Sequence, residues 1–263
     1  MTREVDWSEI ATAAKAGLEH MHGNKDKTMP TGKWEFNAEV TAVFDDMLAN
    51  SIPDYNSMRS LTTQIGEHFL NKRERPTVID LGASKGRAIE PFIDKHGKDN
   101  LRTYLYEVSK PMLAELSSNP KFSSSRIIDT PIQDVANQGY FAHGQASDLV
   151  LSILTLQFTP IEYRAKILNS ISNTLRKGGG FILVEKVLGN TNTLDRLLVD
   201  TYYDMKAGNG YSQEQIAAKR KSLEGVLVPV TAKWNEDMLY AAGFSQVDCF
   251  YRNLNFAGWI AIK

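Results

Sequence analysis

The chain has 263 residues, of which 42% are hydrophobic, so it can bury one large core with an accessory part or two small cores. Its 30 basic and 31 acidic residues almost cancel, and direct binding of nucleic acid or an anionic membrane is not expected. The single cysteine, Cys249, excludes an intrachain disulfide, which suits a reducing cytosol. No apolar run approaches a membrane span and the N-terminus lacks the order of a signal peptide, so we expect a cytoplasmic protein.

Residues 1–31 are predicted to form a separate N-terminal extension, in which Ser8 caps a short helix that reaches His20. His20 and His22 stand two positions apart and so face different sides of a helix. Neither a cysteine nor a third histidine lies near them in the sequence, and we therefore expect no metal site.

Two amphipathic helices are predicted next, over residues 34–50 and from residue 56 or 57 to residue 70. Together they would form a helical cap over residues 32–75, before the first strand. Such helices either close over a site as a lid or only cover one face of the sheet. The sequence leaves both interpretations open.

The motif TVIDLGASKG, residues 77–86, predicts a buried strand, a tight turn of small residues and the start of a helix. Gly82, Ala83 and Ser84 leave room for a ligand at the backbone, and Gly86 allows close packing of helix on strand. Free N–H groups at the helix start can hold a nucleotide-like ligand or an amino-acid carboxylate. An ordinary strand-to-helix turn is the alternative, and the glycine pattern alone does not decide.

Glu107 ends the second predicted strand, residues 101–107, and follows Gly82 by 25 positions. Nucleotide-binding βαβ units place a carboxylate near this spacing, where it accepts hydrogen bonds from the ribose hydroxyls. An acid at a strand end is usually only solvated. Its combination with the glycine turn favours the ribose role for Glu107.

Strands and helices continue to alternate, which predicts an α/β fold with a mostly parallel seven-stranded sheet and helices on both faces. The basic and glycine residues 176–180 are predicted to end a helix over residues 160–175. A polar helical insertion is predicted at about residues 192–225, and a helix at 234–242. The remaining strands are predicted at residues 125–129, 146–153, 181–186, 244–251 and 254–262.

The residues DLGASKG at 80–86, Glu107, LRKGG at 175–179 and the two-strand ending resemble a class I S-adenosylmethionine-dependent methyltransferase, with its Rossmann-like fold. A narrower resemblance is to the carboxy-S-adenosylmethionine synthase family. It spans about residues 32–263 as one methyltransferase-like domain and is most specific at residues 210–224, which generic methyltransferases lack. The segments that carry it are GKWEF at 32–36, VFDDM at 43–47, SIPDY at 51–55, TLQF at 155–158, EK at 185–186, NGYS at 209–212, KR at 219–220, LE at 223–224, AGF at 242–244 and NF at 255–256.

The resemblance implies a homodimeric enzyme that converts S-adenosylmethionine and prephenate to carboxy-S-adenosylmethionine and phenylpyruvate. The product is the carboxymethyl donor for the wobble uridine of certain tRNAs, so any tRNA role would be indirect. The expected ligands are S-adenosylmethionine or its carboxylated form, without a metal.

Most cofactor-binding residues implied by the resemblance lie in or beside the motifs above. Glu107 replaces the family's aspartate on the ribose, and Val108 replaces an asparagine. Pro131 stands where the family has an aspartate near the adenine and cannot supply its carboxylate, which leaves Asp129 or Gln133 as substitutes. The full implied set is Tyr55, Asp80, Gly82, Ala83, Ser84, Glu107, Val108, Pro131, Ile132 and, near the family's asparagine after the fourth strand, Ser152.

Arg220 matches the family's arginine that reaches from the partner subunit to the added carboxylate. A guanidinium suits this role because it forms two parallel, charge-assisted hydrogen bonds. The alternative is a solvated arginine beside other lysines. Glu185 and Lys186 are expected to form an ion pair without a catalytic role, and Gln157 with Phe158 either line the cofactor or belong to the core.

Two other functions remain open at the level of sequence. The departures at Val108, Pro131 and Ser152 keep a methyltransferase that acts on a small molecule or nucleic acid as an alternative. The second alternative is a non-catalytic subunit that binds S-adenosylmethionine.

Overall fold

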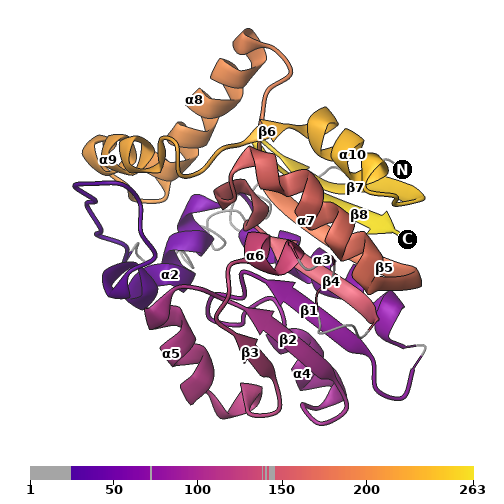
Figure 1. Ribbon diagram of the computed structural model, residues 1–263. Coiled ribbons are helices and arrows are strands. Elements are labelled where there is room, and N and C mark those ends of the chain that lie inside the picture. Colours follow the sequence, from indigo (N-terminus) through magenta and orange to yellow (C-terminus); the bar gives the residue numbers. More distant parts are fainter. Residues whose placement is uncertain (1–24, 72, 138, 140, 142–145) are drawn as a thin grey trace, which may run out of the picture.

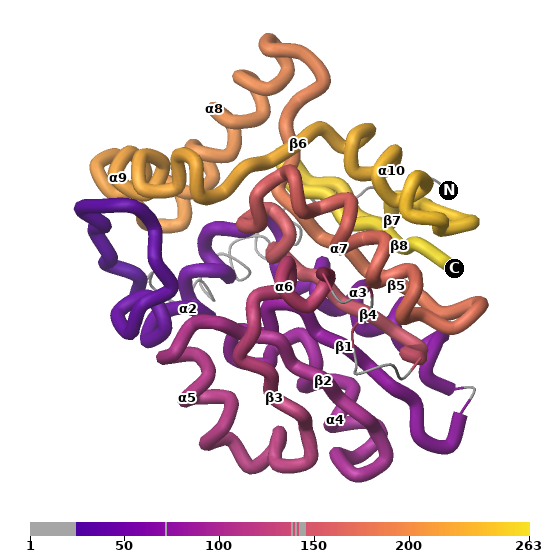
Figure 2. The backbone as a smooth tube through the Cα atoms, viewed as in Figure 1, coloured from indigo at the N-terminus to yellow at the C-terminus, as the bar shows by residue number. Residues whose placement is uncertain are grey.

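The computed structural model describes residues 25–71, 73–137, 139, 141 and 146–263, and the helix and two histidines predicted before residue 25 lie outside this part. One sheet runs through the molecule with helices on both sides (Figures 1 and 2). Its strand order is β3-β2-β1-β4-β5-β8-β7, and β6 pairs with β5 off this path. The strands are β1 (Thr77–Leu81), β2 (Arg102–Tyr106), β3 (Arg126–Ile128), β4 (Ser147–Ile153), β5 (Leu175–Leu188), β6 (Val230–Thr231), β7 (Gln246–Asn253) and β8 (Phe256–Ile262).

Strands β1 to β5 pair in parallel, whereas β8 runs antiparallel to both β5 and β7. The predicted α/β class and the two closing strands are therefore confirmed. The short strand β6 was not predicted, because two residues are too few to show a strand pattern.

Alternate residues of the strands face two separate cores, as the two-residue repeat of a strand requires. On one face Ile79 and Phe181 pack with α6, α7 and α10, and on the other Val78 and Ile182 pack with α3 and α4. Burial on both faces explains why the central strands are almost continuously apolar. The helices are α2 (Ala38–Ser51), α3 (Tyr55–Leu70), α4 (Glu90–His96), α5 (Lys110–Ser118), α6 (Ile132–Ala136), α7 (Ile161–Thr174), α8 (Asn192–Gly208), α9 (Gln213–Leu223) and α10 (Ala232–Ala241), with short 3-10 turns η1 (Pro120–Phe122) and η3 (Leu156–Phe158).

Helix α7 ends at Thr174, within one residue of its predicted end, but residues 176–180 belong to the first part of β5 and do not cap the helix. Arg176 forms an ion pair with Asp148 at 3.1 Å. Gly180 lies under the ring of Phe69, which would stand 2.6 Å from a Cβ at that position. The basic residues and glycines of this segment make contacts within the sheet. The same residue types are common at helix ends, so the local sequence pattern cannot distinguish the two cases.

Helix boundaries follow capping groups more closely than the apolar pattern. Helix α2 begins at Ala38 because the side chain of Asn37 accepts a hydrogen bond from the backbone N–H of Val40 at 3.0 Å. Helix α4 begins at Glu90 with Pro91 in its first turn, where the missing N–H of proline costs no intrahelical hydrogen bond. Of the helices in the described residues, none is long and apolar enough to cross a membrane.

Candidate active site

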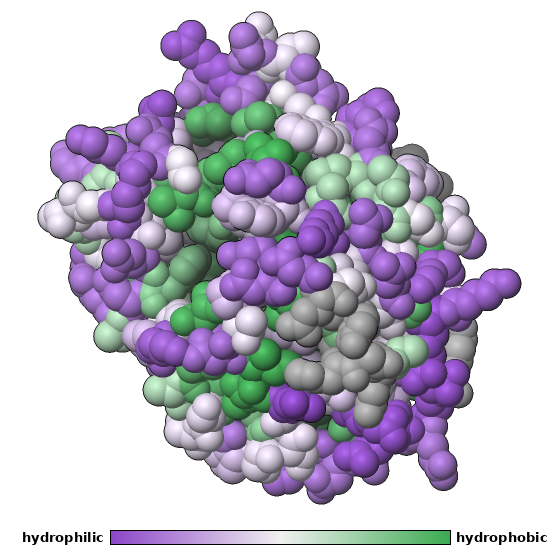
Figure 3. Space-filling model, viewed as in Figure 1, coloured by the Kyte–Doolittle hydropathy of each residue, from purple (hydrophilic) through white to green (hydrophobic). Residues whose placement is uncertain are grey.

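A cavity of about 420 Å³ lies at the carboxyl ends of β1, β2 and β4. Open α/β sheets bind ligands at this edge, where the chain connections diverge on either side of β1 and β4. Helices α2 and α3 supply one part of its wall, and α8 and α9 supply another. Figure 3 shows hydrophobic side chains gathered around a hollow on the viewed face of the molecule. Helices α2 and α3 line the cavity and α3 also packs on the core of the sheet, so the cover interpretation is supported, while closure as a lid stays a prediction.

The turn after β1 forms one wall of the cavity through Gly82, Ala83 and Ser84. The N–H groups of Gly82 and Ala83 both donate to the carbonyl of Tyr106 on β2, at 2.9 and 2.8 Å. Gly82 has a φ of +74°, and a Cβ there would stand 2.3 Å from the hydroxyl oxygen of Thr155. Only glycine satisfies both constraints, and the turn can therefore bring its backbone against a ligand.

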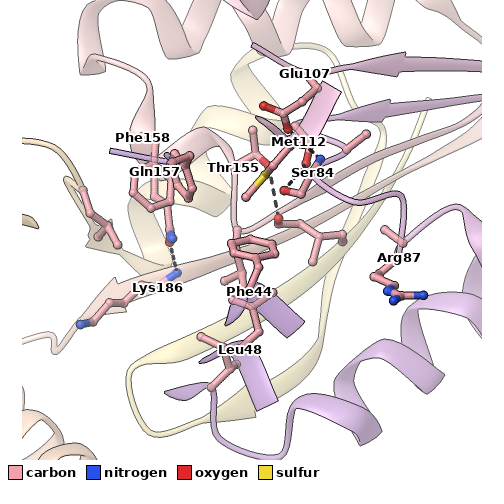
Figure 4. A pocket seen from close by; sticks show the side chains of 18 of the residues that line it. Phe44, Leu48, Ser84, Arg87, Glu107, Met112, Thr155, Gln157, Phe158 and Lys186 are labelled. Atoms are coloured by element: carbon pink, nitrogen blue, oxygen red, sulfur yellow. Dashed lines mark hydrogen bonds between the residues drawn. The ribbon is translucent and has the colours of Figure 1, made fainter. Parts of the chain in front are cut away.

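The carboxylate of Glu107 lies beside this turn and lines the same cavity (Figure 4). Its Oε2 accepts from the N–H of Ser84 at 2.7 Å, and its Oε1 accepts from those of Val108 and Ser109 at 2.8 and 2.7 Å. The sequence correctly predicted that Glu107 and the glycine turn share a site. Because a carboxylate has about four acceptor positions, Glu107 can hold the backbone and still accept from ribose hydroxyls; that role stays a prediction.

Asp80 supplies a second carboxylate to the cavity wall and is 1% exposed. Burial, and then the nearby charge of Glu107, raise the pKa of Asp80 to about 7. Its Oδ2 finds no hydrogen-bond partner among the residues that the structure describes. Such an oxygen fits a ligand that brings its own donor, and the ammonium group of S-adenosylmethionine is a donor of that kind. The Gly82 turn and Asp80 thus fit an adenosyl ligand with an amino-acid tail.

Further residues of the predicted set reach the cavity from other elements. Tyr55 on α3 lines it, as do Val108, Pro131 and Ile132. Gln133 lines the wall as well, and its role as a substitute for the carboxylate missing at Pro131 stays a prediction.

Two predicted site residues are placed differently. Ser152 is 1% exposed within β4 and does not line the cavity; the residues after it, Ile153 to Thr155, take that place. Asp129 pairs with Lys110 and also stays off the cavity wall. A strand residue faces one side of the sheet, and a one-residue shift in an alignment therefore moves a side chain out of the site.

Arg220 is exposed on α9 and does not line the cavity of its own chain. The preceding residue, Lys219, does line it and is 4% exposed. The position of Arg220 on the surface leaves its contribution to a partner subunit as a prediction.

Glu185 and Lys186 do not form the predicted ion pair, because neighbouring strand residues point to opposite faces. Glu185 is 2% exposed and interacts electrostatically with Arg164 of α7, while burial raises the pKa of Glu185 to about 8. Lys186 faces the cavity, and its backbone N–H donates to Oε1 of Gln157 at 2.6 Å (Figure 4). Gln157 and Phe158 both line the cavity, and Phe158 also packs against the apolar cluster that contains Trp34 and Phe44. Their contact with the cofactor stays a prediction.

Sequence reasoning missed the end of the cavity that lies against the helical insertion. Tyr202 and Lys206 of α8 line it together with Lys186 and Lys219. No spacing rule marks them, although Lys186 and Lys219 stand inside the segments EK and KR that carry the family resemblance. Among the described residues, no group of three or more His, Cys, Asp or Glu side chains is arranged to hold a metal ion.

The sheet order, the glycine turn and the adjoining carboxylates define the class: an S-adenosylmethionine-dependent transferase of the methyltransferase superfamily. Residues 79–183 match the methyltransferase domain family. A solved O-methyltransferase family protein from Burkholderia thailandensis superposes with a TM-score of 0.61 over 97% of this chain and 70% of that chain, at 14% identity. A second, 1,6-didemethyltoxoflavin-N1-methyltransferase from the same organism with bound S-adenosylhomocysteine, gives a TM-score of 0.53 over 100% and 92% of the two chains, at 16% identity. These likenesses concern the fold alone.

Curated relatives narrow the assignment. A carboxy-S-adenosyl-L-methionine synthase from Wolinella succinogenes is 36% identical over 231 residues, 88% of this chain and 94% of that protein. One from Methylococcus capsulatus is 34% identical over 228 residues, 87% of this chain and 93% of that protein. The chain belongs to the carboxy-S-adenosyl-L-methionine synthase family.

Proposed function

We propose that the protein converts S-adenosylmethionine and prephenate to carboxy-S-adenosylmethionine, phenylpyruvate and water. The observation that carries the proposal is the shared cavity. Tyr202, Lys206 and Lys219 of the helical insertion line the same space as Gly82 and Glu107. Lys219 belongs to residues 210–224, the segment most specific to the family, and this segment thus lines the space that fits the cofactor, where a second substrate must lie.

The proposed reaction needs no nucleophile from the protein. Prephenate loses carbon dioxide and hydroxide as its ring becomes aromatic, which leaves phenylpyruvate. The hydroxide takes a proton from the S-methyl group, whose acidity the sulfonium increases, and leaves as water. The carbon of the resulting ylide then forms a bond to carbon dioxide, giving the carboxymethyl group. Atoms and charges balance without a redox partner.

The protein contributes position, charge complementarity and exclusion of water. Phe44, Met47 and Leu48 of α2 present an apolar wall to the cavity that the glycine turn also lines. Water near this wall would protonate the ylide before carbon dioxide is captured. An apolar wall therefore favours carboxylation over loss of the intermediate.

We further propose that the active form is a homodimer in which Arg220 of one subunit binds the added carboxylate in the other. Arg220 is exposed and thus accessible to a second chain. Helix α8 extends away from the body of the molecule (Figure 1), and its Leu194 and Leu197 are 46% and 60% exposed. Exposed leucines on a projecting helix suit an interface between subunits. The product would supply the carboxymethyl group for the wobble uridine of tRNA.

Mass spectrometry of the ligand released from purified protein tests the proposal. We expect a species about 44 mass units heavier than S-adenosylmethionine, since one carbon dioxide is added to the cofactor. Phenylpyruvate should form when S-adenosylmethionine and prephenate are supplied together. Release of S-adenosylhomocysteine alone, without consumption of prephenate, would overturn the proposal in favour of methyl transfer.

A further inference from the structure

Three lysines from three different elements meet at the insertion end of the cavity: Lys186 of β5, Lys206 of α8 and Lys219 of α9. Lys206 and Lys219 are only 6% and 4% exposed, and Lys186 is half-buried. Lysines are rarely buried unless they are paired, so a cluster of this kind needs a physical explanation.

The rings of Tyr202 and Tyr211 lie close to the three ammonium groups. The Nζ atoms of Lys186 and Lys206 lie 4.8 and 5.7 Å from the centre of the Tyr202 ring. Those of Lys206 and Lys219 lie 4.6 and 4.8 Å from the centre of the Tyr211 ring. The negative faces of aromatic rings stabilise an ammonium group but do not cancel its charge. The cluster therefore remains cationic.

Only one of the three lysines has a carboxylate partner in the described ranges. Lys219 forms an ion pair with Asp26, which is fully buried. Neither Lys186 nor Lys206 forms an ion pair there, although Asp195 acts on Lys186 from a distance. Burial lowers the pKa of Lys186 and of Lys206 to about 8, and Lys206 is further affected by the two neighbouring ammonium groups. At neutral pH two cations thus face the cavity without an ion-pair partner among the residues that the structure describes.

We propose that Lys186 and Lys206 form a subsite for a carboxylate of the second substrate. The buried ion pair of Lys219 and Asp26 holds the adjoining wall in place and does not itself bind the ligand. The class of ligand is a small dicarboxylate whose apolar part lies against the Phe256 ring, which also lines this end of the cavity. The identity of the ligand as prephenate rests on the proposed function; the existence of the anion subsite does not. The subsite is separate from Arg220, which would act on the product carboxylate from the partner subunit.

The test compares Lys186→Met and Lys206→Met with Lys233→Met. The side chain of Lys233 on α10 is 77% exposed, pairs with Asp237 and does not line the cavity. We expect both cavity variants to raise the KM for prephenate about tenfold or more, equal to about 1.4 kcal/mol. The Kd for S-adenosylhomocysteine, measured by calorimetry, should change less than about twofold in every variant. Lys206→Arg should recover part of the loss because it keeps the charge.

Binding of malonate to the S-adenosylhomocysteine-loaded protein separates this proposal from the proposed function. If the wild type does not consume prephenate but binds malonate, and both cavity variants lose that binding, the subsite stands and the proposed function fails. If the wild type consumes prephenate and the folded cavity variants do so with unchanged KM, the subsite is wrong. A wild type that binds neither dicarboxylate also overturns it. Thermal unfolding shows which variants are folded. If Lys206→Met does not fold, the comparison of Lys186→Met with the separate variant Lys206→Arg still tests the subsite.

Discussion

Asp26 and Lys219 form a buried ion pair that joins two segments 193 positions apart. Asp26 lies in the stretch predicted as a separate extension, outside the family resemblance, whereas Lys219 lies in its most specific segment. The hydroxyl of Tyr211 donates to the same carboxylate at 2.8 Å, and that of Thr28 donates to its other oxygen at 2.6 Å. Residues 25–31 therefore have a structural connection to the wall of the cavity, while the domain boundary at residue 31 stays a prediction.

We predict that Asp26→Asn lowers the free energy of unfolding by about 3 kcal/mol, because it leaves the buried Lys219 without a counter-charge. Burial opposes ionisation of Asp26, but hydrogen bonds from Lys219, Thr28 and Tyr211 outweigh burial and lower the pKa of Asp26. The carboxylate is thus charged at neutral pH, and replacing it with a neutral amide lowers the free energy of unfolding at that pH. Urea unfolding at pH 7 measures the change.

The matched control for this variant is Asp237→Asn, which breaks the exposed pair with Lys233. It should cost less than about 0.5 kcal/mol, since exposed ion pairs contribute little. Equal effects of the two substitutions would contradict a special role for the buried pair.

Gly82→Ala should weaken binding of S-adenosylhomocysteine about a hundredfold. The added Cβ would stand 2.3 Å from the Thr155 hydroxyl, and φ at this position is +74°. Relief of the clash must move the turn, and with it the backbone that faces the ligand. Calorimetry on the folded variant gives the Kd. Gly208→Ala serves as the control, because a Cβ there meets nothing within 4 Å; affinity lost equally in both would show that the turn is not the cause.

The KM for prephenate should rise as the pH increases through about 8. Burial lowers the pKa of Lys186 and of Lys206 to about 8, so both side chains are charged below this pH and lose their charge above it. In the part of the chain that the structure describes, Asp195 acts electrostatically on Lys186, and Lys186, Lys219 and Asp26 act on Lys206. Steady-state kinetics between pH 6.5 and about 9 measures the effect, which stays flat if the lysines do not bind the substrate.

Protein stability should increase with pH over the same range in which affinity for the substrate decreases. Between about pH 8 and the ordinary lysine pKa of 10.5, the unfolded chain binds more protons at Lys186 than the folded chain does. The free energy of unfolding therefore rises with pH in this window. The rise should be smaller in Lys186→Met, and denaturant unfolding at pH 7.5 and 9.5 would show it.

Arg220→Ala should weaken carboxy-S-adenosylmethionine about tenfold or more and S-adenosylmethionine less than about twofold, because only the former brings the extra carboxylate. Mixing this variant with Gly82→Ala tests whether Arg220 acts across subunits. A mixed dimer would contain one site with both an intact turn and the partner's arginine, so about a quarter of all sites should regain activity. Without such recovery, Arg220 does not act from the partner.

The sequence alone determined the sheet class, the turn at residues 77–86 and the pairing of that turn with Glu107. These features arise from local causes: a run of apolar residues, glycines that permit a positive φ, and a fixed spacing within one βαβ unit. The family also followed from sequence, because its identifying segments are contiguous.

Only the tertiary structure decided which side chains face the cavity. Neighbours such as Glu185 and Lys186 separate to opposite faces of one strand, and Ser152 turns out to be off the site. The lysine cluster combines positions 186, 206 and 219 from a strand and two helices, and their spacing in the sequence does not predict that they lie close together. Packing of the insertion on the sheet sets these contacts, since the directions of side chains depend on how whole elements pack rather than on their neighbours in sequence.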